Sequence, residues 1–269
     1  MGEIEVNNFS LKYTIESGQF FRYYPIDGWY YIVSRNNVFK IKQEDNKLIY
    51  EGDCNEFFIR EFLGLNDNMD EFIKFAKNKD LNKFLEKYPG IRIMKQDLWQ
   101  CLVSFVCSSA SNVKKIQLNL NLLSQYFGKQ IKYDNKIFYS FPEPRSLNDL
   151  EKLKEAKTGY RANFLFNINN MVDETFIRNL RLVKYEKAKE ILTSLPGVGE
   201  KVADCVLLFS LGHKNAFPVD VWIKRMMEEL YFSGEKTSIK KIREFAEEEF
   251  GEHCGYVQQY LFHYGRMNG

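Results

Sequence analysis

The stretch "LPGVGEKVADC", residues 195–205, lies between two apolar segments that both have helical spacing. A proline and two glycines interrupt the helical pattern, and Lys201 stands at the start of the second segment. Residues 185–211 therefore predict a helix-hairpin-helix with a tight turn at Gly197, Val198 and Gly199. The first amides of the second helix have no partners within the helix, so they offer a site for an anion such as a DNA phosphate.

The turn alone leaves two interpretations open, an ordinary connection between helices and a phosphate-binding turn. It lacks the spacing of a nucleotide-binding phosphate loop. An ordinary lysine has a pKa near 10.4, so only about one in 2,500 is neutral at pH 7, and only the neutral amine is a nucleophile. The positive end of a helix, together with burial, favours that neutral form. Lys201 is therefore a candidate nucleophile, with a phosphate-contacting lysine as the alternative.

A carboxylate follows at a distance that suits the lysine. The helix expected at 200–211 spans about 18 Å, and residues 212–219, "GHKNAFPV", are enough to bring the chain back to its start. Asp220 then lies near Lys201 and also precedes the next helix, "VWIKRMMEEL", as a good N-cap residue. A capping role holds the carboxylate in place, so a structural and a catalytic role are compatible.

The composition is that of a folded globular protein, and it argues against a membrane protein and against a metal or iron–sulfur protein. The 269 residues are 45% hydrophobic and 28% charged, and the net charge of +2 means that any nucleic-acid surface is local. The acidic start "MGEIEVNNFS" has no signal pattern and no long apolar run occurs, so we expect a cytoplasmic protein without membrane contact. The five scattered cysteines have no C-x-x-C spacing, which predicts reduced thiols and no metal or iron–sulfur site.

The secondary-structure pattern changes along the chain. Residues 20–53 alternate aromatic and β-branched segments with turns, which predicts a small antiparallel sheet. Strands first and helices afterwards indicate an α+β fold, with an N-terminal sheet domain with flanking helices at 1–95 and a helical domain at 96–269. Helices are expected near 69–88, 97–109, 112–127, 147–156, 160–171, 185–194, 200–211, 221–231, 238–250 and 255–267.

With "FPVDV" at 217–221, the hairpin resembles that of the helix-hairpin-helix glycine/proline/aspartate DNA glycosylases. It is most similar to the 8-oxoguanine DNA glycosylases that also cleave the abasic strand. Four further motifs match in order: "SGQFFR" (17–22), "MKQDLWQCLVSFVCSS" (94–109), "GYRA" (159–162) and "CGYVQQYLFHYGR" (254–266). The resemblance implies a DNA repair enzyme that removes 8-oxoguanine from double-stranded DNA through a lysine Schiff base and cleaves the strand by β-elimination.

The resemblance also assigns roles to residues of the site. Lys201 is implied as the nucleophile, and Asp220 as the carboxylate that stabilises positive charge on the sugar. The implied base pocket consists of Gly18, Cys205, Gln258, Phe262 and Trp222. Spacing agrees with it, because Cys205 follows Lys201 by four residues and Phe262 follows Gln258 by four, so that each pair shares a helix face. Taken singly, Cys205 and Phe262 also suit a core and Gln258 a surface.

A second set of residues is implied to bind DNA: Gly197, Val198, Gly199, Asn112, Lys115, Tyr160 and Arg161. Here the chain departs from the eukaryotic members. Ala110, Ser111 and Asn112 stand where those proteins have three asparagines, and Lys115 stands where they have arginine. Trp222 replaces a histidine. Because some readers of the opposite base are missing, we expect relaxed opposite-base specificity.

The implied enzyme is a monomer, associated with the nucleoid through DNA. It has no cofactor, although a structural cation at the hairpin is compatible with the family. Two alternatives stay open at this point. One is a hairpin glycosylase for another oxidised base, and the other is a non-catalytic DNA-binding hairpin protein.

Overall fold

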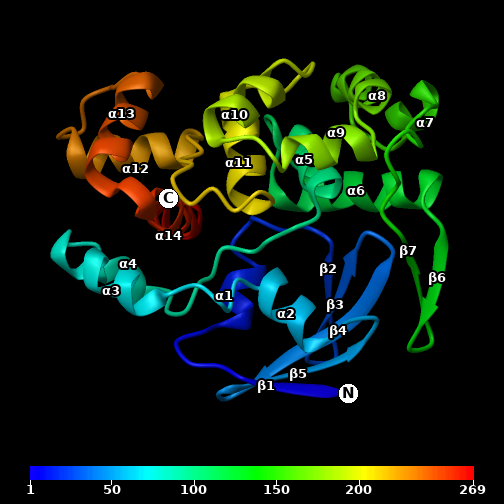
Figure 1. The fold of residues 1–269 in the computed structure, drawn as a ribbon, viewed down its shortest axis with the longest axis horizontal. Coiled ribbons are helices and arrows are strands. Elements are labelled where there is room, and N and C mark those ends of the chain that lie inside the picture. Colours follow the sequence, from blue (N-terminus) through cyan, green and yellow to red (C-terminus); the bar gives the residue numbers. More distant parts are fainter.

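The computed structural model describes residues 1–269 and confirms the α+β class, with most of the strands before most of the helices (Figure 1). The strands are β1 (Gly2–Glu5), β2 (Tyr23–Ile26), β3 (Trp29–Ser34), β4 (Asn37–Glu44), β5 (Lys47–Gly52), β6 (Gln130–Tyr133) and β7 (Lys136–Tyr139). The helices are α1 (Leu11–Ile15), α2 (Glu56–Phe62), α3 (Met69–Asn78), α4 (Asn82–Lys87), α5 (Leu98–Ser108), α6 (Val113–Phe127), α7 (Leu150–Glu155), α8 (Arg161–Met171), α9 (Glu174–Leu180), α10 (Tyr185–Thr193), α11 (Glu200–Phe209), α12 (Val221–Tyr231), α13 (Ile239–Phe250), the 3-10 helix η1 (Gly251–His253) and α14 (Cys254–Asn268).

The N-terminal sheet is antiparallel, with strand order β1-β5-β4-β3-β2. Its central strands pair Ile41 with Tyr50 and Ile32 with Phe39. Because side chains alternate across a strand, Ile32, Phe39 and Ile41 share one face, where they form a core with Phe62 of α2. The first strand, β1, was not predicted, since four residues carry too little alternation to identify.

A second hairpin, β6 and β7, covers the other face of the sheet and was also not predicted. Tyr31 of β3 stacks on Phe138 of β7 with ring centroids 5.6 Å apart, and Val33 and Val38 complete this small core. Figure 1 shows the hairpin in green beside the blue sheet. A segment from the helical part of the sequence therefore packs on the N-terminal sheet.

Helices α3 and α4 lie before residue 95 in the sequence but pack with the C-terminal helices. Phe72 contacts Tyr256 with centroids 5.0 Å apart, and Phe84 contacts Tyr264 at 4.8 Å. These two contacts join α3 and α4 to α14, and Figure 1 shows α3 and α4 beneath α14. The domain division at residue 95 stays a prediction. The side-chain cores change between Leu65 and Met69, except that Phe21 belongs to the helical core and Met94 to the core of the sheet.

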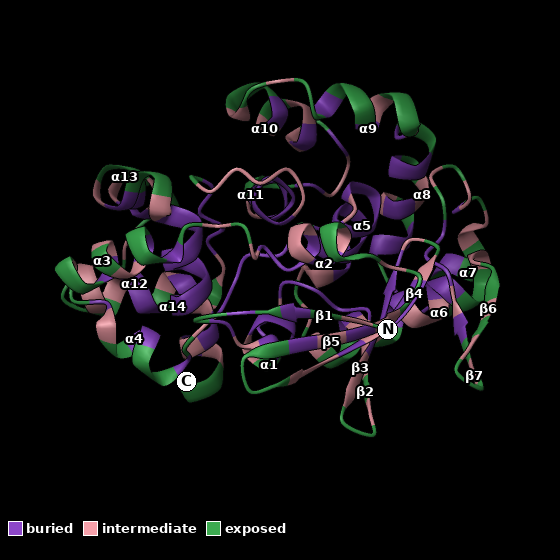
Figure 2. Ribbon diagram, turned by 60° about the horizontal axis from the view of Figure 1, so that its bottom comes forward, coloured by how far each residue is buried: buried purple, intermediate pink, exposed green.

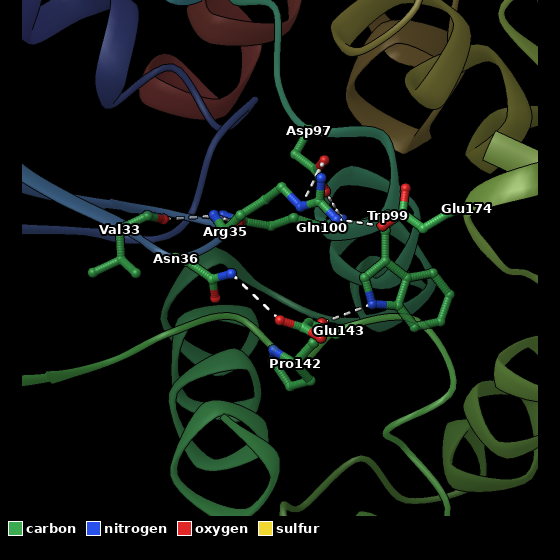
Figure 3. A network of polar contacts seen from close by, with 9 residues as sticks. All are labelled: Val33, Arg35, Asn36, Asp97, Trp99, Gln100, Pro142, Glu143 and Glu174. Atoms are coloured by element: carbon green, nitrogen blue, oxygen red, sulfur yellow. Dashed lines mark hydrogen bonds and ion pairs between the residues drawn. The ribbon is translucent and has the colours of Figure 1, made fainter. Parts of the chain in front are cut away.

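The sheet is fastened to the helical part by a polar network at α5 (Figure 3). Gln100 accepts a hydrogen bond from the Arg35 amide at 2.9 Å and donates to the Val33 carbonyl at 3.2 Å. The Arg35 guanidinium pairs with Asp97 at 3.4 Å and with Glu174 at 2.6 Å. The turn between β3 and β4 is thus held against the start of α5, which fixes the sheet relative to that helix.

Helices α5 and α11 form the centre of the helical part. Ten of the eleven residues of α5 and eight of the ten residues of α11 are buried, as the purple ribbon in Figure 2 shows. The nearly all-round apolar character of α5 agrees with this central place, whereas α11 also buries one carboxylate, Asp204. No helix of the protein combines the length and the apolar character needed to cross a bilayer.

Candidate active site

The hairpin joins α10 to α11, as predicted from its glycines. Gly197 has φ +74°, and a Cβ built on it would lie 2.5 Å from the ring of Phe164 in α8, so both backbone and space require glycine here. The Val198 amide is used within the turn, where it donates to the Leu195 carbonyl at 3.1 Å. Gly199 is the N-cap of α11 and brings no side-chain cap. The first amides of α11 are therefore the ones available to an anion.

Residues far apart in the sequence line one cavity of about 230 Å³. They come from the loop after α1, from α5, α6, α11 and α14, and from the segment that leads into α12. Eight of the predicted site residues are among them: Gly18, Asn112, Lys201, Cys205, Asp220, Trp222, Gln258 and Phe262. The structure therefore brings both predicted catalytic residues and the whole predicted base pocket to one place.

Lys201 reaches this cavity from the first turn of α11. Its Nζ donates to Ser108 Oγ at 3.0 Å and lies 5.2 Å from the ring centroid of Phe105. It has no ion-pair partner within 4.0 Å. A lysine without a carboxylate partner, beside an aromatic ring and at the positive end of a helix, is in surroundings that suit a nucleophile.

Asp220 is fixed as the N-cap of α12. Its Oδ1 accepts hydrogen bonds from the amides of Trp222 at 3.0 Å and Ile223 at 2.9 Å, while Oδ2 has no donor. Burial raises the pKa of the Asp220 carboxyl, and the two amides and the charge of Lys201 work against that rise. The capping role expected from the sequence is thus confirmed, and one carboxylate oxygen is left for chemistry.

The base pocket has one thiol, one ring and one amide. Cys205 is 2% exposed, and burial raises the pKa of its thiol to about 12, so it is a neutral, apolar group. Gln258 is buried on α14, and its Oε1 has no hydrogen-bond partner. An unpartnered buried amide oxygen costs about 1–3 kcal/mol, which a donor on a ligand would recover. Phe262 lies one turn further along α14 and lines the same cavity.

Gly18 is held against this pocket by α14. Its φ is +83°, and a Cβ on it would lie 2.9 Å from Cε1 of Phe262. Gln259 donates to the Ser17 carbonyl at 3.1 Å, and Arg266 donates to the Glu16 carbonyl at 2.5 Å. The backbone at Gly18 therefore has a fixed position at the cavity wall, as recognition by a carbonyl requires.

The residues predicted to contact DNA outside the pocket have different environments. Tyr160 is 57% exposed, and Lys115 is exposed on α6, where Asn112 caps the helix by accepting from the Lys115 amide at 3.0 Å. Arg161 is only 3% exposed, and its guanidinium donates to the carbonyls of Thr158, Ser109 and Ala110. Its contact with DNA stays a prediction and requires the side chain to leave these carbonyls.

Several residues of the cavity carried no sequence assignment. Ser108 and Phe105 lie in the matched motif "MKQDLWQCLVSFVCSS" at 94–109, which assigns them no role, and Arg266 ends the last matched motif. Phe21, Ile116 and Phe209 add apolar wall. The available signal was that Phe105 and Ser108 are three residues apart and so share a helix face.

Comparisons with known proteins agree with this geometry. A family model described as "8-oxoguanine DNA glycosylase, N-terminal domain" matches residues 3–102. The "Probable N-glycosylase/DNA lyase" of Methanothermobacter thermautotrophicus is 30% identical over 234 residues, covering 78% of this chain and 75% of that protein. The chain belongs to the 8-oxoguanine DNA glycosylase family.

Two further proteins are similar to this chain. The Clostridium acetobutylicum 8-oxoguanine glycosylase/lyase, solved with double-stranded DNA containing cytosine opposite 8-oxoguanine, is 30% identical with a TM-score of 0.90, covering 100% of this chain and 98% of that one. The "N-glycosylase/DNA lyase" of Saccharomyces cerevisiae is 35% identical over 171 residues, which is 57% of this chain and 46% of that protein.

Proposed function

We propose that this protein removes 8-oxoguanine from double-stranded DNA and then cleaves the abasic strand. The observation that carries the proposal is that two residues line the same cavity: Lys201, which has no ion-pair partner, and Asp220, whose carboxylate is anchored. Binding of a phosphate by hairpin amides requires neither residue. A non-catalytic DNA-binding protein would therefore leave this arrangement unexplained.

Base removal begins with a nucleotide turned out of the duplex, because C1′ of a stacked nucleotide is out of reach. The neutral amine of Lys201 attacks C1′, the C1′–N9 bond breaks, and its electron pair leaves with the base, which takes up a proton. Positive charge grows on the sugar during this step, and the carboxylate of Asp220 stabilises it. The second oxygen of Asp220, which has no donor, is free for this role.

Strand cleavage follows from the same covalent bond. Loss of the amine proton and opening of the sugar ring give a protonated Schiff base between C1′ and Lys201 Nζ. Removal of a C2′ proton then allows the C3′–O bond to break, and the 3′ phosphate leaves with the electron pair of that bond. Water finally hydrolyses the imine and restores the lysine.

The cavity also suits recognition of the oxidised base. In the proposed complex Cys205 and Phe262 pack on the two faces of the purine, while Gln258 bonds its Watson–Crick edge. The N7 proton of 8-oxoguanine donates to the Gly18 carbonyl. Guanine has a lone pair at N7 in place of that proton, so an unpaired carbonyl would discriminate against it.

The partner is double-stranded DNA containing 8-oxoguanine, anchored through a phosphate at the start of α11. Trp222 replaces the histidine of eukaryotic members at the cavity wall, where it stacks or donates but does not titrate. The monomeric state, the cytoplasmic location on nucleoid DNA, the hairpin cation and the independence from other cofactors stay predictions from the sequence. No group of three or more His, Cys, Asp or Glu side chains is placed to hold a metal ion.

Borohydride trapping tests the proposal. Incubated with borohydride and an 8-oxoguanine duplex, the protein is expected to become covalently attached to the DNA, because the hydride reduces the Schiff base. A duplex with undamaged guanine and one with an oxidised pyrimidine serve as comparisons. Faster trapping on the oxidised pyrimidine would favour another lesion, and no trapping on any damaged duplex would contradict the proposed chemistry.

We expect weaker discrimination between opposite bases than in the eukaryotic enzymes. A bidentate arginine or asparagine contributes about 1–3 kcal/mol against a wrong base, a factor of about 5 to 150. Ala110 offers no such contact, and Lys115 is a flexible point donor without the planar fork of arginine. Single-turnover excision on four duplexes that differ only in the base opposite 8-oxoguanine measures the effect, and adenine or guanine should be accepted at appreciable rates.

The paired variant Ala110→Asn with Lys115→Arg should steepen the preference for cytosine. The fold should tolerate it, because Ala110 is exposed with φ +47°, a conformation that asparagine adopts more readily than alanine. A steep preference for cytosine in the wild type that stays unchanged in the variant would remove these two positions from opposite-base reading.

A further inference from the structure

The Lys201 amine donates a hydrogen bond to the hydroxyl group of Ser108. Ser108 Oγ donates its only proton to the Phe105 carbonyl at 2.7 Å, so it meets Lys201 Nζ, 3.0 Å away, as an acceptor. A neutral amine that gives one N–H to this oxygen has its lone pair in a restricted set of directions. The Phe105 ring, 5.2 Å from Nζ, limits the amine on another side. The direction of nucleophilic attack thus depends on where Ser108 lies.

Ser108 is the last residue of α5, and the two residues after it are held by Arg161. The guanidinium donates to the carbonyls of Ser109 and Ala110 and, at 3.2 Å, to that of Thr158. Arg161 is buried and has no carboxylate within 4.0 Å, so its two terminal nitrogens depend on these carbonyls, while Nε has no partner. Ala110 has φ +47°, a costly conformation for alanine, and the hydrogen bonds of Arg161 hold the turn in it.

We propose that Ser108 is a positioning residue for the Lys201 nucleophile, and that Arg161 sets the place of Ser108 through the carbonyls of Ser109 and Ala110. The inference rests on the proposed function, since it concerns the attack of Lys201 on a sugar carbon. Arg161, which lies outside the cavity, would then contribute to the alignment of the nucleophile. Any contact that moves Arg161 away from the turn would also shift the Ser108 hydroxyl that orients the Lys201 amine.

The first test is Ser108→Ala, with Ser104→Ala as the matched control. Ser104 lies one turn earlier on α5 and donates to the Gln100 carbonyl at 2.6 Å, but it does not line the cavity. Single-turnover excision across pH should fall by about 30- to 100-fold for Ser108→Ala, as for a misplaced reacting group. The loss should be the same at every pH tested, because Ser108 fixes the direction of the amine. Ser108→Thr, which keeps the hydroxyl, should recover most of the rate.

The same variants are also measured on a duplex that already contains an abasic site. Schiff-base formation on this duplex needs Lys201 but no lesion recognition. It therefore tests the positioning role of Ser108 separately from the proposed removal of 8-oxoguanine. Absence of 8-oxoguanine excision by the wild type would contradict the proposed function. Schiff-base formation by Ser108→Ala at the wild-type rate, or a loss that disappears as the pH is raised, would overturn the positioning role.

The link to Arg161 is tested by a double-mutant cycle with Arg161→Lys and Ser108→Ala. The duplex has no base opposite the abasic site, so a direct contact of Arg161 with that base does not contribute. Arg161→Lys alone should slow Schiff-base formation about tenfold, and the double variant should be no more than about twofold slower than Ser108→Ala. If the rate loss of the double variant equals the product of the two single losses, Arg161 does not act through Ser108. Thermal melts check folding, and Arg161→Gln replaces Arg161→Lys if the latter melts more than about 5 °C lower.

Discussion

Replacing Lys201 with glutamine is expected to abolish both base excision and borohydride trapping. Glutamine is one atom shorter than lysine and uncharged, and its amide nitrogen is no nucleophile. Removal of a nucleophile costs about 10⁴-fold or more in single-turnover rate. Binding to an 8-oxoguanine duplex should change by less than about tenfold, because only one charge is lost and the amides at the start of α11 are kept.

Lys187→Gln is the control for the loss of one lysine charge near the hairpin. Lys187 is exposed on α10 and pairs only with Glu190, at 2.9 Å. Its excision rate should match that of the wild type. Trapping of Lys201→Gln at the wild-type yield would show that another amine forms the Schiff base.

The second large effect is expected for Asp220→Asn, which should slow excision by about 10²- to 10⁴-fold and leave the fold intact. Asparagine caps helices about as well as aspartate, so the hydrogen bonds from the Trp222 and Ile223 amides are preserved. Only the negative charge is removed. Single-turnover kinetics and a thermal melt measure the two expectations separately.

A pH profile adds an independent signature for Asp220. Because burial raises the pKa of this carboxyl above its ordinary value of 3.8, the acid limb of the wild-type profile should lie above pH 3.8. Protonation below that limb removes the charge that stabilises the sugar, so the rate falls as pH falls. Asp220→Asn should lose this contribution to the fall in rate.

Asp149→Asn is the matched control, since Asp149 caps α7 by accepting from the Lys152 amide at 3.1 Å and lies outside the cavity. Excision by Asp220→Asn at the wild-type rate would show that the Asp220 side chain has only a structural role.

The sequence predicted the helical part well because its signals are local. Gly197 lies in the turn of the hairpin, where φ is positive, and Asp220 caps the next helix. The nearly all-round apolar character of α5 agrees with its central position. Each of these features depends on a few neighbouring residues. Local rules are sufficient for such elements.

Two strand segments were missed for different reasons. The four residues of β1 form a strand only because β5 pairs with them, from Gly2 with Tyr50 to Glu5 with Lys47, and local alternation does not show a partner that far along the chain. The β6–β7 hairpin did carry a signal. Asp134 and Asn135, both with positive φ, form its turn between alternating residues, and that pattern was overlooked in a helical region.

The site residues also fall into two groups, those that local motifs identify and those whose contacts only the tertiary structure shows. Motifs identified the pocket residues, but not the contact of Ser108 with Lys201, since 93 residues separate them. The buried state of Arg161 was also beyond the sequence. A motif places an arginine next to an exposed tyrosine, whereas only tertiary structure shows that its charge is directed at the carbonyls of Ser109 and Ala110.

The attachment of Gly18 to α14 has a consequence for folding. The bonds from Gln259 to Ser17 and from Arg266 to Glu16 join residues 242 and 250 positions apart, so the recognition wall has very high contact order. Such long-range closure is slow, and during synthesis it has to wait for α14 to leave the ribosome. The sheet and the hairpin come earlier in the chain and can form before α14, so the proposed phosphate-binding turn is complete before the proposed base pocket.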